Sequence, residues 1–166
     1  MLAWELIVVV LLILLNGFFA MSELAVVSAR RARLQQMADE GDRGARAAVR
    51  LVEDPSKFLS TVQVGITLIG ILAGAYGGAT FAGYLAVELR RFPAVEPYAD
   101  GVSIAVVVMT ITYLSLIVGE LVPKRIALVN AERIAAMVAR PMGVVATMGA
   151  PPGRRRRCGH PPRSST

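Results

Sequence analysis

Three long apolar runs constrain the fold of this chain more than any other feature. They cover residues 2–28, 58–89 and 102–122. A helix needs about 20 mostly apolar residues to cross the hydrocarbon core of a bilayer, and a helix satisfies its backbone polar groups within its own segment. We therefore expect an all-α membrane protein whose three transmembrane helices form one domain over residues 1–150, with the lipid bilayer as its surroundings.

The second run is too long for one simple crossing. Gly77 and Gly78 predict a break, because glycine weakens a helix interior. We expect a span over residues 58–76 and a short outer helix after it. Residues 142–150 are apolar but too short to cross, and we expect them to begin a fourth element.

The first run has a competing interpretation as a secretory signal peptide. Such a peptide normally carries basic residues ahead of its apolar stretch. Here the chain begins Met-Leu-Ala-Trp-Glu, and its first basic residue is Arg30. The sequence therefore favours a retained membrane span over a cleaved signal.

The distribution of basic residues predicts an orientation. Seven Lys and Arg residues lie between the first and second runs, and only Arg90 and Arg91 lie between the second and third. Several more follow the third run. Cytoplasmic segments carry the excess of Lys and Arg. We therefore expect the N-terminus outside and the C-terminus in the cytoplasm.

The loop over residues 30–55 mixes apolar and charged positions, and glycines interrupt it at positions 41 and 44. It predicts two short cytoplasmic juxtamembrane amphipathic helices. A similar pattern follows the third run, at Leu128, Ile134, Met137 and Val138. Two interpretations stay open: these helices lie on the membrane surface, or they pack only on each other.

The net charge of +6 does not indicate a nucleic-acid partner. The tail over residues 151–166 holds five Arg and no acidic residue, so it supplies five of the six net charges. Its Pro, Arg and Ser composition predicts disorder, because it has too few apolar residues to build a core. The single Cys158 excludes an internal disulfide. We find no nucleophile–base pair or hydrolytic motif, so we do not expect an enzyme.

Oxygen-bearing side chains gather near the inner ends of the three runs. Glu23 lies about two helical turns before Arg30, and Glu120 lies near the inner end of the third run. The others are Ser22, Ser60, Gln63, Thr67, Thr112 and Ser115. Such oxygens, with no Cys or His nearby, suit a hard cation such as Mg²⁺. The alternative stays open that Glu23 or Glu120 extends to the interface, or pairs with Arg30 or Lys124.

Two backbone features accompany these side chains. Pro123 predicts the end of the third helix and the release of carbonyl groups near Glu120. Asn16 and Gly17 weaken the first helix in a similar way. A separate set of small residues recurs every four positions in the second run and serves either packing within the chain or a homodimer seam. These residues are Gly70, Gly74 and Gly78.

Three motifs in order resemble the transmembrane domain of the CNNM/CorC family, in its bacterial, haemolysin-like branch. The first is Asn-Gly-Phe-Phe-Ala-Met-Ser-Glu-Leu-Ala at residues 16–25. The second is Phe-Leu-Ser-Thr-Val-Gln-Val-Gly-Ile-Thr at residues 58–67, and the third covers residues 119–128. The resemblance extends over residues 2–142.

The resemblance implies a homodimeric domain in the bacterial inner (plasma) membrane that transports or exports Mg²⁺, and in some members Co²⁺. It implies that an inward-facing cavity holds the divalent cation. Carried over to this chain, the metal ligands are Ser22, Thr67 and Glu120, with Gly119 and Pro123 shaping the helix end. Many members have Asn near the end of the second motif, where this chain has Ile66 and Thr67.

Family members usually continue into a paired nucleotide-binding CBS region, whereas this sequence ends in the tail. We therefore expect a truncated or out-of-frame end. The first functional hypothesis is a divalent-cation transporter domain with Mg²⁺ as the transported ion. The alternative is a membrane anchor or dimerisation module that transports nothing.

Overall fold

The computed structural model describes residues 2–148, and every regular element in that range is helical. Three helical stretches are long and apolar enough to cross a membrane: Ala3–Ser28, Ser56–Leu89 and Glu96–Val129. They confirm the predicted fold class. The elements are α1 (Leu2–Ser28), α2 (Arg31–Asp39), α3 (Arg43–Glu53), α4 (Ser56–Leu89), η1 (Glu96–Tyr98), α5 (Ala99–Leu116), η2 (Ile117–Leu121), α6 (Val122–Val129) and α7 (Ala131–Met148). The tail over residues 151–166, predicted to be disordered, lies outside the described residues.

The predicted break in the second span is wrong, because α4 is one continuous helix of 34 residues. Gly77 is buried, and a Cβ at this position would lie 2.3 Å from Cδ1 of Ile111. The missing side chain therefore lets α5 approach α4 closely. Breaking the helix would also expose backbone polar groups where no water can satisfy them. Both effects outweigh the cost of a glycine in a helix, about 1 kcal/mol.

Pro123 does not end the third helix, contrary to prediction. The chain passes from α5 into the π-helical segment η2, and α6 continues it through Pro123 to Val129. A π-helical turn takes one extra residue into the helix. The wider turn just before Pro123 lets the chain continue where an α-helix would lose a hydrogen bond and meet the proline ring.

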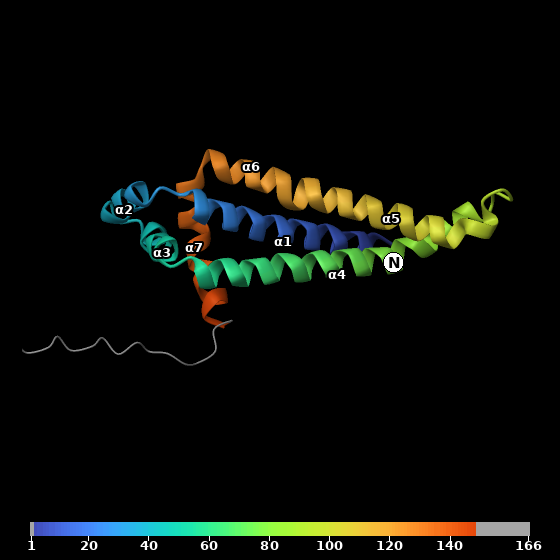
Figure 1. Cartoon of the computed structure of the whole chain (residues 1–166), viewed down its shortest axis with the longest axis horizontal. Helices are drawn as coiled ribbons and strands as arrows, with labels where there is room; N and C mark the ends of the chain where they lie inside the picture. The colour runs from blue at the N-terminus through green and yellow to red at the C-terminus, as the bar shows by residue number, and fades with distance from the viewer. Residues whose placement is uncertain (1, 149–166) are drawn as a thin grey trace, which may run out of the picture.

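The first span lies at the centre of the described structure. Figure 1 shows α1 between α4 on one side and the line of α5 and α6 on the other. The main apolar core is at one end of this bundle, where α1 and α4 meet α2, α3, α6 and α7. Its fully buried side chains include Val26, Leu34, Phe58, Val62 and Val138. Toward the other end, long stretches of the spans carry exposed apolar side chains.

Two short helices occupy the loop after the first span, as predicted. Gly41 separates them with φ +104°, a conformation that favours glycine. Asp42 then caps α3: its Oδ1 accepts hydrogen bonds from the N–H groups of Gly44 and Ala45. The buried face of α3 packs on α7, so these helices pack on each other.

The last helix differs from the prediction for residues 142–150. Residues 142–148 complete α7, which begins at Ala131 and contains Pro141 in its interior, so they begin no separate element. Residues 149 and 150 lie outside the described part of the chain. Figure 1 shows α7 lying across the ends of α1 and α4, with α2 and α3 beyond it.

Candidate functional site

The π-helical segment is attached to α1 by one buried hydrogen bond. Pro123 has no N–H group to donate to the carbonyl of Gly119 four residues earlier. The side-chain Nδ2 of Asn16 donates to that carbonyl oxygen at 3.1 Å. Asn16 thus supplies a donor at the point where the proline removes one.

Two glycines allow this close approach. A Cβ on Gly17 would lie 2.9 Å from Cγ of Pro123. A Cβ on Gly119 would lie 3.2 Å from both the Asn16 amide nitrogen and the Ile13 carbonyl oxygen. A Cβ at either position would therefore be tighter than an ordinary contact, and the neighbouring atoms would have to shift.

A cavity of about 350 Å³ opens next to this contact. Its wall from α4 includes Gly70 and Gly74, where an added Cβ would meet no atom within 4 Å. These two glycines therefore do not serve packing within the described chain, and they widen the cavity. The lining residues are Asn16, Ile66, Thr67, Gly70, Ile71, Gly74, Ile111, Thr112, Ser115, Leu116 and Glu120.

Two of the three predicted metal ligands reach this cavity. Thr67 and Glu120 both line it, from α4 and η2. The Thr67 hydroxyl donates to the Gln63 carbonyl at 2.9 Å, which leaves its oxygen lone pairs available. Ser22 is not among the lining residues. It is fully buried, and its hydroxyl donates to the Phe18 carbonyl of its own helix at 2.7 Å.

The carboxylate of Glu120 forms an ion pair with Lys124, one helical turn further along the chain. The two side chains are 37% and 32% exposed, so the pair is partly open to its surroundings. Pairing with Lys124 is thus the alternative that the structure shows for Glu120. Glu23 forms no ion pair within residues 2–148.

Sequence reasoning missed Asn16 as a site residue and treated it only as a weak point of the first helix. Asn16 is 7% exposed, and its Oδ1 has no hydrogen-bond partner among the described residues. A buried polar atom without a partner costs about 1–3 kcal/mol. The available signal was an amide side chain in the middle of an apolar span, where polar groups are expensive and usually functional.

The cavity offers one carboxylate and several neutral oxygens. Within residues 2–148 no three of His, Cys, Asp and Glu gather closely enough to hold a metal ion. Any cation in this cavity would therefore be held by the Glu120 carboxylate together with amide and hydroxyl oxygens. Oxygen ligands of this kind suit Mg²⁺, which retains several of its waters.

A model of the family described as the cyclin M transmembrane N-terminal domain (CNNM) matches residues 6–152. Curated relatives include UPF0053 protein sll0260 of Synechocystis, 55% identical over 89% of this chain and 33% of the relative. UPF0053 protein YhdT of Bacillus subtilis is 37% identical over 83% and 30%. A protein of Escherichia coli K12 named polyamine export protein is 29% identical over 83% and 31%. The chain thus spans about a third of the length of these relatives.

Proposed function

The chain belongs to the CNNM family of transmembrane domains, and from this membership we propose that it carries a cation across the membrane through the cavity lined by Asn16, Thr67 and Glu120. Mg²⁺ is the proposed cargo, with Co²⁺ as a second metal of the same class. The cation is a transported substrate, and the proposal assigns no catalytic reaction to the chain.

The unpartnered Oδ1 of Asn16 is the observation that carries this proposal. It is buried beside a cavity that also holds a carboxylate and hydroxyl groups. A cation or its bound water would satisfy this oxygen and remove the cost of leaving it unpaired. At about 30 Å³ per water, the cavity has room for an ion with several waters.

Within this proposal each residue has a distinct role. Glu120 supplies the charge that attracts the cation, and Thr67 supplies a neutral oxygen from the opposite helix. Asn16 holds the Gly119 carbonyl through its amide nitrogen, and its unpartnered oxygen is the proposed ligand at the cavity wall. Lys124 competes for Glu120, so an arriving cation must displace its ammonium group.

A polyamine is the second candidate cargo. One observation favours it: Glu120 already pairs with the ammonium group of Lys124, and a polyamine is a chain of such groups. The Escherichia coli relative whose name states polyamine export points to the same class of cargo. A polyamine would take the place of the Lys124 ammonium on the same carboxylate.

The location and assembly belong to the same proposal. We place the chain in a bacterial inner membrane, as a homodimer, with α2, α3 and α7 in the cytoplasm. The basic residues of the loop between α1 and α4 support this orientation, since they lie at the end where these three helices gather.

Flux into proteoliposomes tests the proposal. Purified chain is reconstituted, and uptake of Mg²⁺, Co²⁺ and spermidine is measured with and without an imposed Na⁺ gradient. Glu120→Gln should lower uptake of the true cargo by about tenfold or more, since charged hydrogen bonds contribute about 1.5–3 kcal/mol. Glu88→Gln is the matched control, because Glu88 also forms an ion pair with a basic residue close in sequence, Arg91, and does not line the cavity.

The pattern of uptake separates the candidates. If Glu120→Gln loses Mg²⁺ uptake but keeps spermidine uptake, the result supports the metal cargo. If it loses spermidine uptake but keeps Mg²⁺ uptake, the result supports the polyamine. Uptake no greater than in protein-free liposomes would contradict transport by this chain and support the membrane anchor or dimerisation module.

A further inference from the structure

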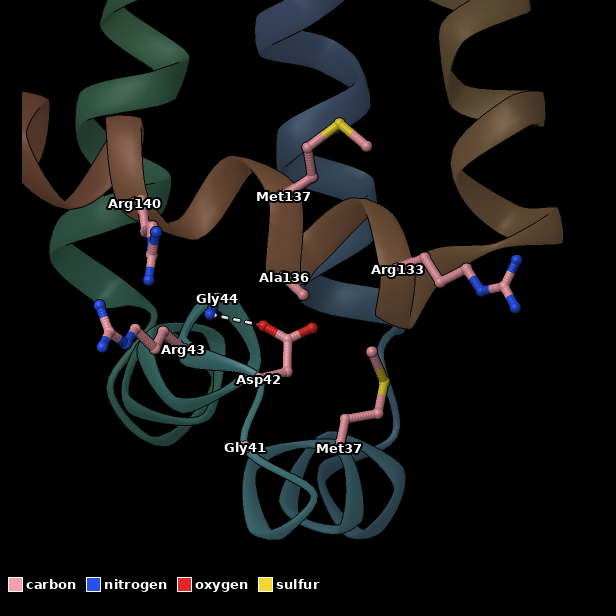
Figure 2. Close-up of a pocket in the computed structure, with 9 residues that line it drawn as sticks. All are labelled: Met37, Gly41, Asp42, Arg43, Gly44, Arg133, Ala136, Met137 and Arg140. Carbon is pink, nitrogen blue, oxygen red and sulfur yellow. Dashed lines mark hydrogen bonds between the residues drawn. The ribbon is translucent and has the colours of Figure 1, made fainter.

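A second pocket, distinct from the transport cavity, lies between α3 and α7. It encloses about 510 Å³ and is lined from α2, the turn after it, α3 and α7. Its backbone is tightly fixed on one side: a Cβ on Gly44 would lie 2.3 Å from the carbonyl oxygen of Ala136. The lining residues, drawn in Figure 2, are Met37, Gly41, Asp42, Arg43, Gly44, Arg133, Ala136, Met137 and Arg140.

The charge of this pocket is strongly unbalanced. It has three guanidinium groups, and none of them forms an ion pair with a residue in the range 2–148. The one carboxylate in the lining, Asp42, already accepts two backbone hydrogen bonds as the cap of α3. In Figure 2, Arg43 and Arg140 lie on the same side of the pocket and Arg133 at the other end.

Arg43 is also unfavourably placed for the stability of its own helix. It is the first residue of α3, where the helix dipole disfavours a positive charge. The local structure of α3 therefore does not explain the positive charge of Arg43. An anion bound in the pocket would explain it. Guanidinium groups match the geometry of phosphate oxygens with paired hydrogen bonds.

The position of the pocket indicates where such an anion comes from. Figure 1 shows α7 lying across the ends of two membrane spans. The lipid headgroups lie beyond the two ends of the hydrocarbon core that such spans cross, so we expect α7 to lie near them. Arg133, Met137 and Arg140 fall at i, i+4 and i+7 of α7 and therefore share one face. Met137 is 74% exposed, and in Figure 2 it extends to the side of α7 where the membrane helices lie.

We propose that this pocket binds the phosphate of an anionic phospholipid headgroup, with Arg43 and Arg140 around the phosphate and Met137 against the apolar part of the lipid. The site goes beyond the transport proposal and does not depend on it. It couples the packing of α3 against α7 to the lipid composition of the membrane.

Lipid binding to the purified full chain in detergent tests the site. The probe is short-chain phosphatidylglycerol, titrated while the thermal unfolding temperature is recorded, with phosphatidylcholine as the neutral-lipid control. Phosphatidylglycerol should raise the unfolding temperature of the unmodified chain, and phosphatidylcholine should not. Arg43→Gln/Arg140→Gln should weaken the apparent affinity by about thirtyfold, as expected for two basic groups that each contribute about 1 kcal/mol.

The matched control is Arg50→Gln/Arg125→Gln, which removes the same charge from exposed positions outside the pocket. It should retain the affinity of the unmodified chain. Equal weakening in both double variants would overturn the proposal in favour of a general basic surface. No response to phosphatidylglycerol, or an equal response to inorganic phosphate alone, would overturn it as well.

The variant itself should fold. Both replaced side chains are exposed, and neither is in the apolar core. Without lipid, Arg43→Gln/Arg140→Gln should unfold at the same temperature as the unmodified chain or slightly higher, since the unfavourable charge at the start of α3 is removed. Should it not fold, the single variants Arg43→Gln and Arg140→Gln test the same site one arginine at a time.

Discussion

At the scale of single residues, Glu120 and Lys124 form the most informative pair. They are one turn apart at the junction of η2 and α6, and both are about one-third exposed. A pair of this kind holds the carboxylate in place and also blocks it. If the cavity carries a cation, as proposed, the strength of the pair sets how readily an incoming cation gains the carboxylate.

Lys124→Gln should lower the Mg²⁺ concentration that gives half-maximal uptake by about two- to fivefold, since a partly exposed ion pair contributes up to about 1 kcal/mol. The substitution removes both the competing ammonium and its repulsion of the metal. Uptake kinetics in proteoliposomes measure the effect, with Arg125→Gln as the neighbouring control. An unchanged or higher half-maximal concentration would show that Lys124 does not compete with the cargo.

At the scale of helices, glycines decide which elements can touch. Gly17 and Gly119 bring α1 against η2, Gly77 brings α4 against α5, and Gly44 brings α3 against α7. The four-residue repeat in the second span predicted either packing within the chain or a homodimer seam. Gly70 and Gly74 have open space beside them, so they do not pack within the described residues, and the seam stays a prediction. A repeat identifies a face with small residues, but only the neighbouring helix determines whether that face is in contact.

Gly44→Ala should destabilise the chain by about 1–3 kcal/mol, the typical cost of overpacking. The added Cβ would meet a backbone carbonyl, which cannot turn aside as a side chain can. Gly83→Ala in α4 is the control, because nothing lies within 4 Å of its Cβ position. Thermal unfolding in detergent compares the two. A Gly44→Ala variant as stable as Gly83→Ala would contradict the described α3–α7 contact.

The sequence predicted the existence and type of the elements better than their continuity. Apolar length identifies a span, since the bilayer sets that length. Whether Gly77 or Pro123 interrupts a span depends on Ile111 and Asn16, which are far away in sequence. The candidate site follows the same rule: Thr67 and Glu120 were predicted from the family resemblance of their own motifs, whereas Asn16 joins the candidate site only through its contact with Gly119.

At the scale of the whole molecule, the structure has two different ends. One end joins α2, α3, α6 and α7 to the spans through a continuous apolar core. At the other end, α4 and α5 are joined through η1, and the ion pair between Arg90 and Asp100 spans this connection. The predicted orientation places the first end in the cytoplasm and the second end outside.

Labelling with a membrane-impermeant thiol reagent tests this orientation. In a Cys158→Ser background, Glu96→Cys should react in intact bacterial cells and Gln35→Cys only after the membrane is made permeable. Both positions are exposed, so access to the reagent and not burial decides the result. The reverse pattern would invert the orientation, since the asymmetry of Lys and Arg is its only basis.

The π-helical segment sets the register of the third span. A π-helical turn holds one residue more than an α-helical turn. If η2 tightened into α-helix, the part of the span beyond it would rotate by about 100° and move by about 1.5 Å relative to α5. Glu120 lies within that segment and Lys124 just beyond it. A change of this turn between the π-helical and α-helical forms would therefore rotate the span about its axis. That rotation would turn the Glu120 carboxylate toward or away from the cavity.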